Sequence, residues 1–322
     1  MKPGNSGAID PAQSAAYGGP GWSPRVASLQ EELGTVWRWC GIDSEWAPLR
    51  AVLLHRPGPE LEDQSDPDAV QMLDRLDLGR AQAQHDAMAQ AYRDAGVEVH
   101  YVAPDAAAPP NLMFCADLLL ATPEGIILAR PASTVRAGEE QLVARRLAQL
   151  GMPILRSVRG RGTFEGADAA WLGPDAALVA TGLRTNPAGA AQVSDLLWEM
   201  GIEAVPVGLP YGAMHLMGTL RFAGPDLAIA WPGRVPFAAV EALRDRGFTL
   251  LFLPAFPGEE QRAALNFVTL GPRRILMPAG HPHSQALLES AGIDCRTVAV
   301  DELLKAAGGI GCLTGVLERD RW

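Results

Sequence analysis

The sequence predicts an α/β fold in which five units, each a strand, a strand, a helix and a strand, close into a ring. Pairs of short apolar runs around a turn rich in Pro, Gly and Asp recur along the chain, which is typical of β-hairpins. Amphipathic helix patterns end five times at a glycine that leads directly into another apolar run. Glycine just past a helix permits the left-handed conformation that ends it. These glycines recur at intervals of 45 to 55 residues: Gly96, Gly151, Gly201, Gly247 and Gly292.

The first unit is divided between the two ends of the chain. The run 49–57 supplies one strand and 81–96 supplies the helix, but no hairpin partner lies nearby. We expect the C-terminal run 312–319 to pair with 49–57, so that the two ends close the ring and no unit keeps an exposed edge. The alternative is an ordinary doubly wound sheet, in which single strands would alternate with helices. Four further hairpins are expected at 116–130, 169–182, 219–232 and 265–278.

Two segments lie outside the repeat. Residues 1–24 are rich in Gly, Pro, Ser and Ala, which predicts a flexible N-terminal tail. Residues 25–322 are expected to form one domain that carries the whole function. The segment 57–70 is acidic, contains proline and is longer than a usual turn, so it could form a lid over a site.

The composition limits the class of partner. The chain has 322 residues, of which 48% are hydrophobic, and a net charge of −10, so it should bury a sizeable core and lacks the basic footprint of a nucleic-acid-binding protein. No apolar run has the length of a membrane span, and the N-terminus has no signal-peptide core. We expect a cytoplasmic protein that binds a small molecule, with neither nucleic acid nor membrane as a partner. The sequence leaves open whether the protein forms an oligomer.

The four cysteines are far apart and lack the CxxC spacing of a zinc site or redox pair. Three of them, Cys40, Cys115 and Cys295, are expected to be small buried hydrophobic residues. Cys312 differs because it follows a Gly-Gly pair and begins the closing strand.

Polar residues occur at corresponding places, where apolar strands begin. Such residues are costly to bury unless they are paired, so we expect them to converge at the axis of the ring. They are Asp117, Glu165, Asp168, His215 and Cys312.

This set has the chemistry of covalent catalysis. A thiolate can attack an electrophilic carbon, while an imidazole gives a proton to the leaving group and then takes one from water. Carboxylates would hold a cation, and guanidinium is a planar cation that matches paired carboxylates. His215 alone, between Met214 and Leu216, would be interpreted as an ordinary core histidine.

The segments "FCAD", "FEGAD", "LRTN", "HLMGTLRF" and "ELLKAAGGIGCLTGVL" resemble the guanidine-modifying pentein superfamily over residues 45–320. This superfamily includes arginine deiminases, dimethylarginine dimethylaminohydrolases and amidinotransferases. The resemblance implies a five-bladed α/β propeller. It also implies that Cys312 is the nucleophile, that His215 is the general acid and base, and that the catalytic Glu165 and Asp117 grip the guanidinium.

The resemblance extends to less specific positions. Arg136 and Arg184 match arginines that receive the substrate's α-carboxylate, although an ordinary salt bridge would also explain each of them. Asp168 would either contact the substrate or orient neighbouring groups. Asn266 and Lys305 recur in relatives, and the sequence assigns them no chemical role.

One departure bears on the substrate. Arginine deiminases and many amidinotransferases have His-x-Asp where this chain has "HLM", so Met217 replaces a carboxylate that grips the guanidinium. Dimethylarginine hydrolases also lack that carboxylate. An N-alkylated guanidinium has fewer N–H donors and brings methyl groups that favour apolar contact. We therefore expect hydrolysis of an N-methylated arginine to citrulline and methylamine or dimethylamine, through a covalent thiouronium bond to cysteine.

Alternatives remain at this point. The same residues could transfer the amidino group from arginine to an acceptor amine, or could deiminate arginine. A non-catalytic pentein that only binds a ligand is the alternative of another class. The chemistry requires no organic cofactor or metal, and His281 and His283 are too few to form a metal site.

Overall fold

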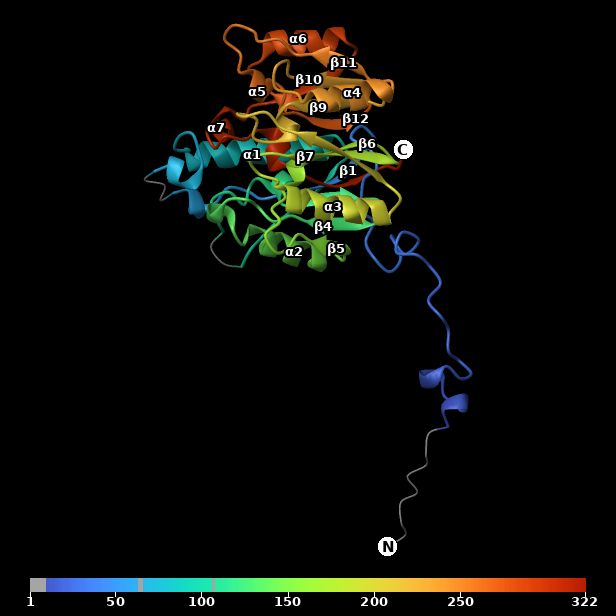
Figure 1. The fold of residues 1–322 in the computed structure, drawn as a ribbon. Helices are drawn as coiled ribbons and strands as arrows, with labels where there is room; N and C mark the ends of the chain where they lie inside the picture. The colour runs from blue at the N-terminus through green and yellow to red at the C-terminus, as the bar shows by residue number, and fades with distance from the viewer. Residues whose placement is uncertain (1–9, 63–65, 106–107) are drawn as a thin grey trace.

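The structure is a computed structural model that describes residues 10–62, 66–105 and 108–322, and it contains five three-stranded sheets. In each sheet the first two strands are antiparallel, and the third is parallel to the second. A helix precedes each third strand, as expected from the predicted unit (Figure 1). The hairpins rule out the doubly wound alternative.

The five units follow one another along the chain. Their strands are β1 (Leu49–Leu54) with β2 (Glu98–Tyr101); β3 (Leu119–Thr122), β4 (Gly125–Leu128) and β5 (Ile154–Ser157); β6 (Ala169–Gly173), β7 (Ala176–Thr181) and β8 (Glu203–Gly208); β9 (Leu220–Gly224), β10 (Leu227–Ala230) and β11 (Thr249–Phe252); β12 (Val268–Gly271), β13 (Arg274–Pro278) and β14 (Asp294–Val298); and the closing strand β15 (Gly315–Arg319). The crossover helices are α1 (Leu78–Asp94), α2 (Glu139–Gln149), α3 (Pro187–Glu199), α4 (Phe237–Asp245) and α6 (Pro282–Ser290).

Short helical turns precede the first strand of each unit. They are η5 (Cys115–Asp117), η7 (Gly166–Asp168), η8 (Leu216–Gly218), α5 (Gln261–Ala264) and α8 (Ile310–Leu313), while α7 (Asp301–Leu304) lies just before α8. The 3-10 helices η3 (Pro59–Leu61), η4 (Asp68–Val70) and η6 (Thr134–Arg136) lie in connecting loops. The sequence pattern did not predict these turns, which carry most of the candidate residues.

The two ends of the chain close the ring. Strand β15 pairs with β1 in antiparallel register, with Leu49 opposite Arg319 and Val52 opposite Val316. Strand β15 also packs against β3 of the second unit, and β1 packs against β12 of the fifth. The predicted pairing of 312–319 with 49–57 is therefore confirmed.

Glycines end the crossover helices as predicted. The five glycines after α1, α2, α3, α4 and α6 all have positive φ, between 74° and 81°, a conformation that costs glycine little. The hairpin strands, by contrast, are covered on both sides: every residue of β3, β4 and β10 is buried. Burial on both faces explains why these strands appear as continuous apolar runs.

The N-terminal region divides into two parts. Residues 10–24 contain two 3-10 helices, Pro11–Gln13 and Ala15–Tyr17, which bury no residue, and they extend away from the ring in Figure 1. Further along, Leu33, Cys40 and Ile42 are buried in the core beside the second and third units. Residues 1–9 of the predicted tail and 63–65 of the predicted lid lie outside the described residues. Within the described part of the chain, none of the helices combines the length and apolar character needed to cross a bilayer.

Candidate active site

The predicted site residues lie where the first strands of the five units begin. Each of these strands begins next to the axis of the ring, so the turns before them meet at one end of that axis. The turns carry Asp117 before β3, Glu165 and Asp168 before β6, His215 before β9, Asn266 before β12 and Cys312 before β15.

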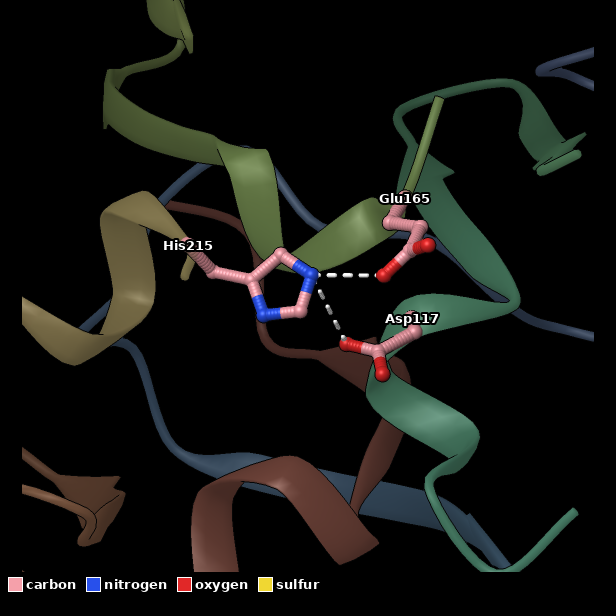
Figure 2. A group of neighbouring side chains, drawn as sticks. All are labelled: Asp117, Glu165 and His215. Atoms are coloured by element: carbon pink, nitrogen blue, oxygen red, sulfur yellow. Dashed lines mark hydrogen bonds and ion pairs between the residues drawn. The ribbon is translucent and has the colours of Figure 1, made fainter. Parts of the chain in front are cut away.

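A histidine and two carboxylates form the centre of this group, and all three are buried (Figure 2). The Nε2 atom of His215 lies 2.6 Å from Oε2 of Glu165 and 3.7 Å from Oδ1 of Asp117. The other ring nitrogen, Nδ1, points away from both carboxylates in Figure 2. His215 can therefore hold one proton against Glu165 and still exchange another through Nδ1.

The carboxylates decide the charge of the imidazole. Burial opposes the charged form of His215, but Asp117, Asp168 and Glu165 outweigh it and raise its pKa well above the usual value. Burial likewise opposes ionisation of Glu165, but its hydrogen bond to His215 and the nearby Arg136 lower its pKa. At neutral pH the pair is an imidazolium and a carboxylate, so His215 carries a proton that it could donate.

Arg136 is tied to the carboxylates. Its side chain is buried, with Nη1 lying 2.5 Å from Oδ2 of Asp117 and Nη2 lying 2.8 Å from Oε2 of Glu139. Burial would lower its pKa, but Asp117, Glu139 and Glu165 raise it. Burial raises the pKa of Glu139 to about 7, with Arg136 opposing. Two buried acceptors on these carboxylates remain without a hydrogen bond from the described residues: Oδ1 of Asp117 and Oε1 of Glu139. Of these two residues, Asp117 lines a cavity that also contains Cys312.

Arg184 occupies a different place. Its Nη1 lies 3.5 Å from Oε1 of Glu165, and 11% of its side chain remains exposed. No other ion pair links Arg184 to the described residues, so its guanidinium is the freer of the two predicted arginines.

Asp168 lies behind His215. It is fully buried, accepts a hydrogen bond from Oγ1 of Thr185 at 2.6 Å, and accepts another from the backbone N–H of Leu216 at 3.1 Å. Burial raises its pKa to about 6, although the charge of His215 and these two hydrogen bonds oppose the shift. These contacts join Asp168 to the loop that carries His215, as the orienting alternative requires.

Asn266 is the residue that the sequence analysis left without a role. Its Nδ2 lies 3.0 Å from Sγ of Cys312, and its Oδ1 accepts the backbone N–H of Cys312 at 3.2 Å. The side chain therefore holds both the thiol and the backbone N–H of Cys312. Asn266 lies just before β12, as His215 lies before β9. This position in the sequence could have identified Asn266 as a candidate site residue. Lys305 instead pairs with Glu302 at 2.9 Å.

Two cavities meet at Cys312. The first, of about 30 Å³, is lined by Cys312, His215, Asp117, Arg136 and Arg184 together with Gln71, Asn111 and Phe114. The second, of about 230 Å³, shares Cys312 and His215 and is lined further by Met217, Trp231 and Asn266. We call them the carboxylate cavity and the Met217 cavity. Glu165 and Asp168 line neither of them.

The remaining cysteines do not reach these cavities. Burial raises the pKa of Cys40 and of Cys295 to about 12, and that of Cys115 further. All four cysteines are free thiols, as predicted. Among them Cys312 alone lines the cavities.

The two histidines at the start of α6 lie outside the site. Nδ1 of His283 lies 2.9 Å from Oε1 of Glu259, and Nδ1 of His281 lies 3.4 Å from the carbonyl oxygen of Pro278. Among the described residues, the atoms close enough together to hold a metal ion belong to Asp117, Glu165 and His215. There Arg136 and His215 already supply two positive charges.

The chain is similar to proteins of known activity. Residues 74–315 match the family described as "N,N dimethylarginine dimethylhydrolase, eukaryotic". An N(G),N(G)-dimethylarginine dimethylaminohydrolase of Streptomyces coelicolor is 30% identical over 271 residues, which cover 83% of this chain and 96% of that protein. The protein of the same name from Pseudomonas aeruginosa is 26% identical over 242 residues, covering 75% of this chain and 90% of that protein.

Solved structures share the fold. A mutant of the Pseudomonas aeruginosa dimethylarginine dimethylaminohydrolase in complex with citrulline superposes with a TM-score of 0.71 at 24% identity, covering 85% of this chain and 100% of that chain. Together with the five three-stranded sheets, this likeness confirms the predicted five-bladed α/β propeller.

Proposed function

The chain belongs to the dimethylarginine dimethylaminohydrolase family of the pentein superfamily, and we propose that it hydrolyses N-methylated arginine through a covalent bond to Cys312. The chain is a hydrolase of C–N bonds in amidines. The observation that carries the finer proposal is the meeting of Cys312, His215 and Asp117 in one cavity, with Glu165 behind the imidazole. The products are citrulline and methylamine or dimethylamine.

The carboxylate cavity receives the guanidinium. Oδ1 of Asp117 is a buried acceptor without a donor among the described residues, and a substrate N–H would satisfy it. Arg184 receives the substrate's α-carboxylate, because its guanidinium is the less engaged. Arg136 holds Asp117 in place and adds positive charge at the same end of the cavity.

The first half-reaction breaks the C–N bond. The thiolate of Cys312 adds to the guanidinium carbon, and the electron pair of the breaking bond stays with the departing nitrogen. His215 protonates that nitrogen, so the amine leaves neutral and the imidazole becomes neutral. The remaining amidino carbon is bound to sulfur as a thiouronium cation.

The second half-reaction reverses the proton's path. Neutral His215 takes a proton from water, and the hydroxide adds to the same carbon. The C–S bond then breaks, its electron pair returns to sulfur, the hydroxyl group of the adduct releases its proton to solvent, and citrulline leaves. Glu165 holds Nε2 of His215 throughout, so the proton passes through Nδ1.

Asn266 positions the nucleophile. A donor 3.0 Å from the sulfur is worth more when the sulfur is charged, because hydrogen bonds to ionised groups contribute about 1.5 to 3 kcal/mol. The contact holds the sulfur in place and stabilises the negative charge that the sulfur carries when the C–S bond breaks.

The Met217 cavity selects the substituted guanidinium. Met217 and Trp231 give it apolar walls next to Cys312 and His215, where N-methyl groups and the departing amine would lie. An unmethylated guanidinium would leave an N–H donor facing these side chains without an acceptor, which is costly.

The test is a product assay. The purified chain is incubated with asymmetric dimethylarginine, monomethylarginine or arginine, each with and without glycine, and the products are identified by mass spectrometry. Citrulline from the methylated substrates alone supports the proposal. Citrulline from arginine would indicate a deiminase, and ornithine with a new guanidino compound only in the presence of glycine would indicate amidino transfer. No product from any substrate would favour a binding protein.

A further inference from the structure

A third cavity lies on the axis of the ring, directly behind the candidate active site. Its walls are the inward faces of the first strands of all five units, including Leu119, Ala170, Phe222, Val268 and Val316. None of the proposed catalytic residues lines it, although Gly311 and Met217 do. Its volume of about 70 Å³ exceeds the ~10–15 Å³ that one water molecule needs on the same measure. We call it the axial cavity.

Two arginines from different strands face this apolar space. Arg319 on β15 is 4% exposed; its Nη1 donates to the carbonyl oxygen of Ala47 at 2.7 Å, and its Nε has no partner among the described residues. Arg221 on β9 donates to the carbonyl oxygen of Phe267 and lies over that ring, with the guanidinium carbon 5.6 Å from the ring centroid. Both arginines line the axial cavity.

The positive charges in this cavity are not balanced. Within the described residues, no carboxylate oxygen lies within 4.0 Å of a nitrogen of Arg221 or Arg319. By contrast, Arg50 on β1 and Arg273 in the turn between β12 and β13 each have such a partner. The one acidic residue of the lining is Glu45, and its Oε1 accepts the backbone N–H of Trp171 at 3.0 Å. Two arginines and one carboxylate leave one excess positive charge in an apolar enclosure.

Burial of the two guanidinium groups makes each of them less basic. Burial lowers the pKa of Arg319 to about 10, with Glu45 opposing and Arg221 adding to the effect. Burial lowers the pKa of Arg221 as well. Both side chains still carry their proton at neutral pH. An unpaired buried charge is costly unless a counter-charge accompanies it.

We propose that the axial cavity is a binding site for a small monovalent inorganic anion such as chloride, held between Arg221 and Arg319. One such ion balances the excess charge, and the unpaired Nε of Arg319 supplies a directed donor. The apolar walls exclude ions that keep a large hydration shell. The size of the cavity excludes organic acids as large as gluconate.

An anion in the axial cavity would influence Cys312 because Arg221 packs against the neighbouring backbone. A Cβ atom on Gly311 would lie 2.9 Å from Nη2 of Arg221, so this guanidinium packs directly against the residue before Cys312. An anion beside Arg221 would reduce the positive potential behind Cys312. The proposal of an anion site does not depend on the reaction that Cys312 performs.

The first experiment locates the ion. Crystals of the full chain are soaked in sodium bromide, and anomalous scattering is recorded near the bromine edge. We expect a peak inside the ring between the guanidinium groups of Arg221 and Arg319. Bromide peaks confined to the outer surface would overturn the proposal.

The second experiment measures linkage to stability. Thermal unfolding is followed in sodium chloride and in sodium gluconate at equal ionic strength. We expect chloride to raise the Tm of the wild type in a saturable way, by about 2–4 °C at roughly ten times its Kd. Arg319→Met should abolish the difference between the two salts, whereas Arg50→Met, which removes an exposed arginine paired with Asp320, should keep it. An equal response in Arg319→Met and wild type would contradict the site, and if Arg319→Met does not fold, the bromide experiment decides alone.

Discussion

His215 owes its proposed role to the carboxylates around it. Its imidazole is 4% exposed, and an uncompensated charge there would be costly. Because its folded-state pKa is raised above the ordinary histidine value of 6.5, the charged pair with Glu165 stabilises the fold fully below pH 6.5. This contribution is lost as the pH rises through the folded pKa. For Glu165 the sign is opposite: its pKa is lowered from 4.5, so its contribution is lost only when the pH falls through the lowered value.

The pH profile of activity follows from the same cause. We expect kcat/KM for dimethylarginine to fall on the alkaline side with an apparent pKa well above 6.5, because the first half-reaction needs protonated His215. Glu165→Gln removes a charge that raises the pKa of His215, so its alkaline limb should move by about one pH unit or more toward neutrality, with a lower kcat. The exposed Glu260→Gln serves as the control. An unchanged limb in Glu165→Gln would refute the assigned proton donor.

Asn266 should act through the thiol. Asn266→Ala removes the donor 3.0 Å from the sulfur of Cys312, and we expect kcat and the rate of alkylation by iodoacetamide at neutral pH both to fall by about tenfold or more. Cys312→Ala identifies the alkylated site, since the other three cysteines are buried away from the cavities or have a raised pKa. A merely structural role would lower stability and leave the alkylation rate of the folded protein unchanged.

The sequence predicted which residues lie at the candidate site better than it predicted which side chains they contact. Asp117, His215 and Cys312 were found because a reactive side chain where an apolar strand begins is conspicuous. The ion pair of Arg136 with Asp117 joins residues 19 positions apart across a turn whose path no periodicity describes. The contact of Asn266 with Cys312 spans 46 positions and depends on two units meeting at the axis.

Among the elements, the helix ends and hairpins were predictable and the short turns were not. A glycine that ends a helix and the Pro, Gly and Asp residues of a hairpin turn act on their immediate neighbours. These features can therefore be recognised directly in the sequence. The turns η5, η7 and η8 have three residues each and follow from packing of the strands around them. These turns bring Asp117, Glu165 and His215 together, which is why the site's geometry required the structure.

Strand β15 joins the end of the chain to its beginning, and its buried residues should be decisive for stability. Leu317 is fully buried, so Leu317→Ala should lower the free energy of unfolding by about 2–5 kcal/mol. The matched change Leu73→Ala, at a side chain that is 64% exposed, should cost less than about 1 kcal/mol. Denaturant unfolding of both variants measures the difference, and equal midpoints would show that β15 does not hold the ring together.

On the scale of the whole molecule, the pairing of β15 with β1 both closes the ring and places Cys312 at the candidate site. Cys312 directly precedes β15, the strand that completes the first unit, whereas Asp117 and His215 precede the first strands of the second and fourth units. The sequence predicted this closure because one hairpin lacked a local partner. It could not predict the axial cavity, since the positions of Arg221 and Arg319 depend on how five sheets pack around one axis.

The N-terminal residues are expected to be dispensable for this assembly. Residues 10–24 form two short 3-10 helices, and neither helix contains a buried residue. A chain lacking residues 1–24 should therefore keep kcat, KM and Tm within error of the full chain, as measured by citrulline formation and thermal unfolding. Loss of activity with an unchanged Tm would instead assign the tail a part in the site.

The measurement that tests the central claim most directly is rapid acid quenching of the enzyme during turnover of asymmetric dimethylarginine, followed by peptide mass spectrometry. The account predicts an adduct on the peptide that contains Cys312, with the mass of the substrate less dimethylamine, which appears before citrulline and is absent in Cys312→Ala. Citrulline formation by Cys312→Ala, or turnover by the wild type with the adduct on another residue, would contradict it.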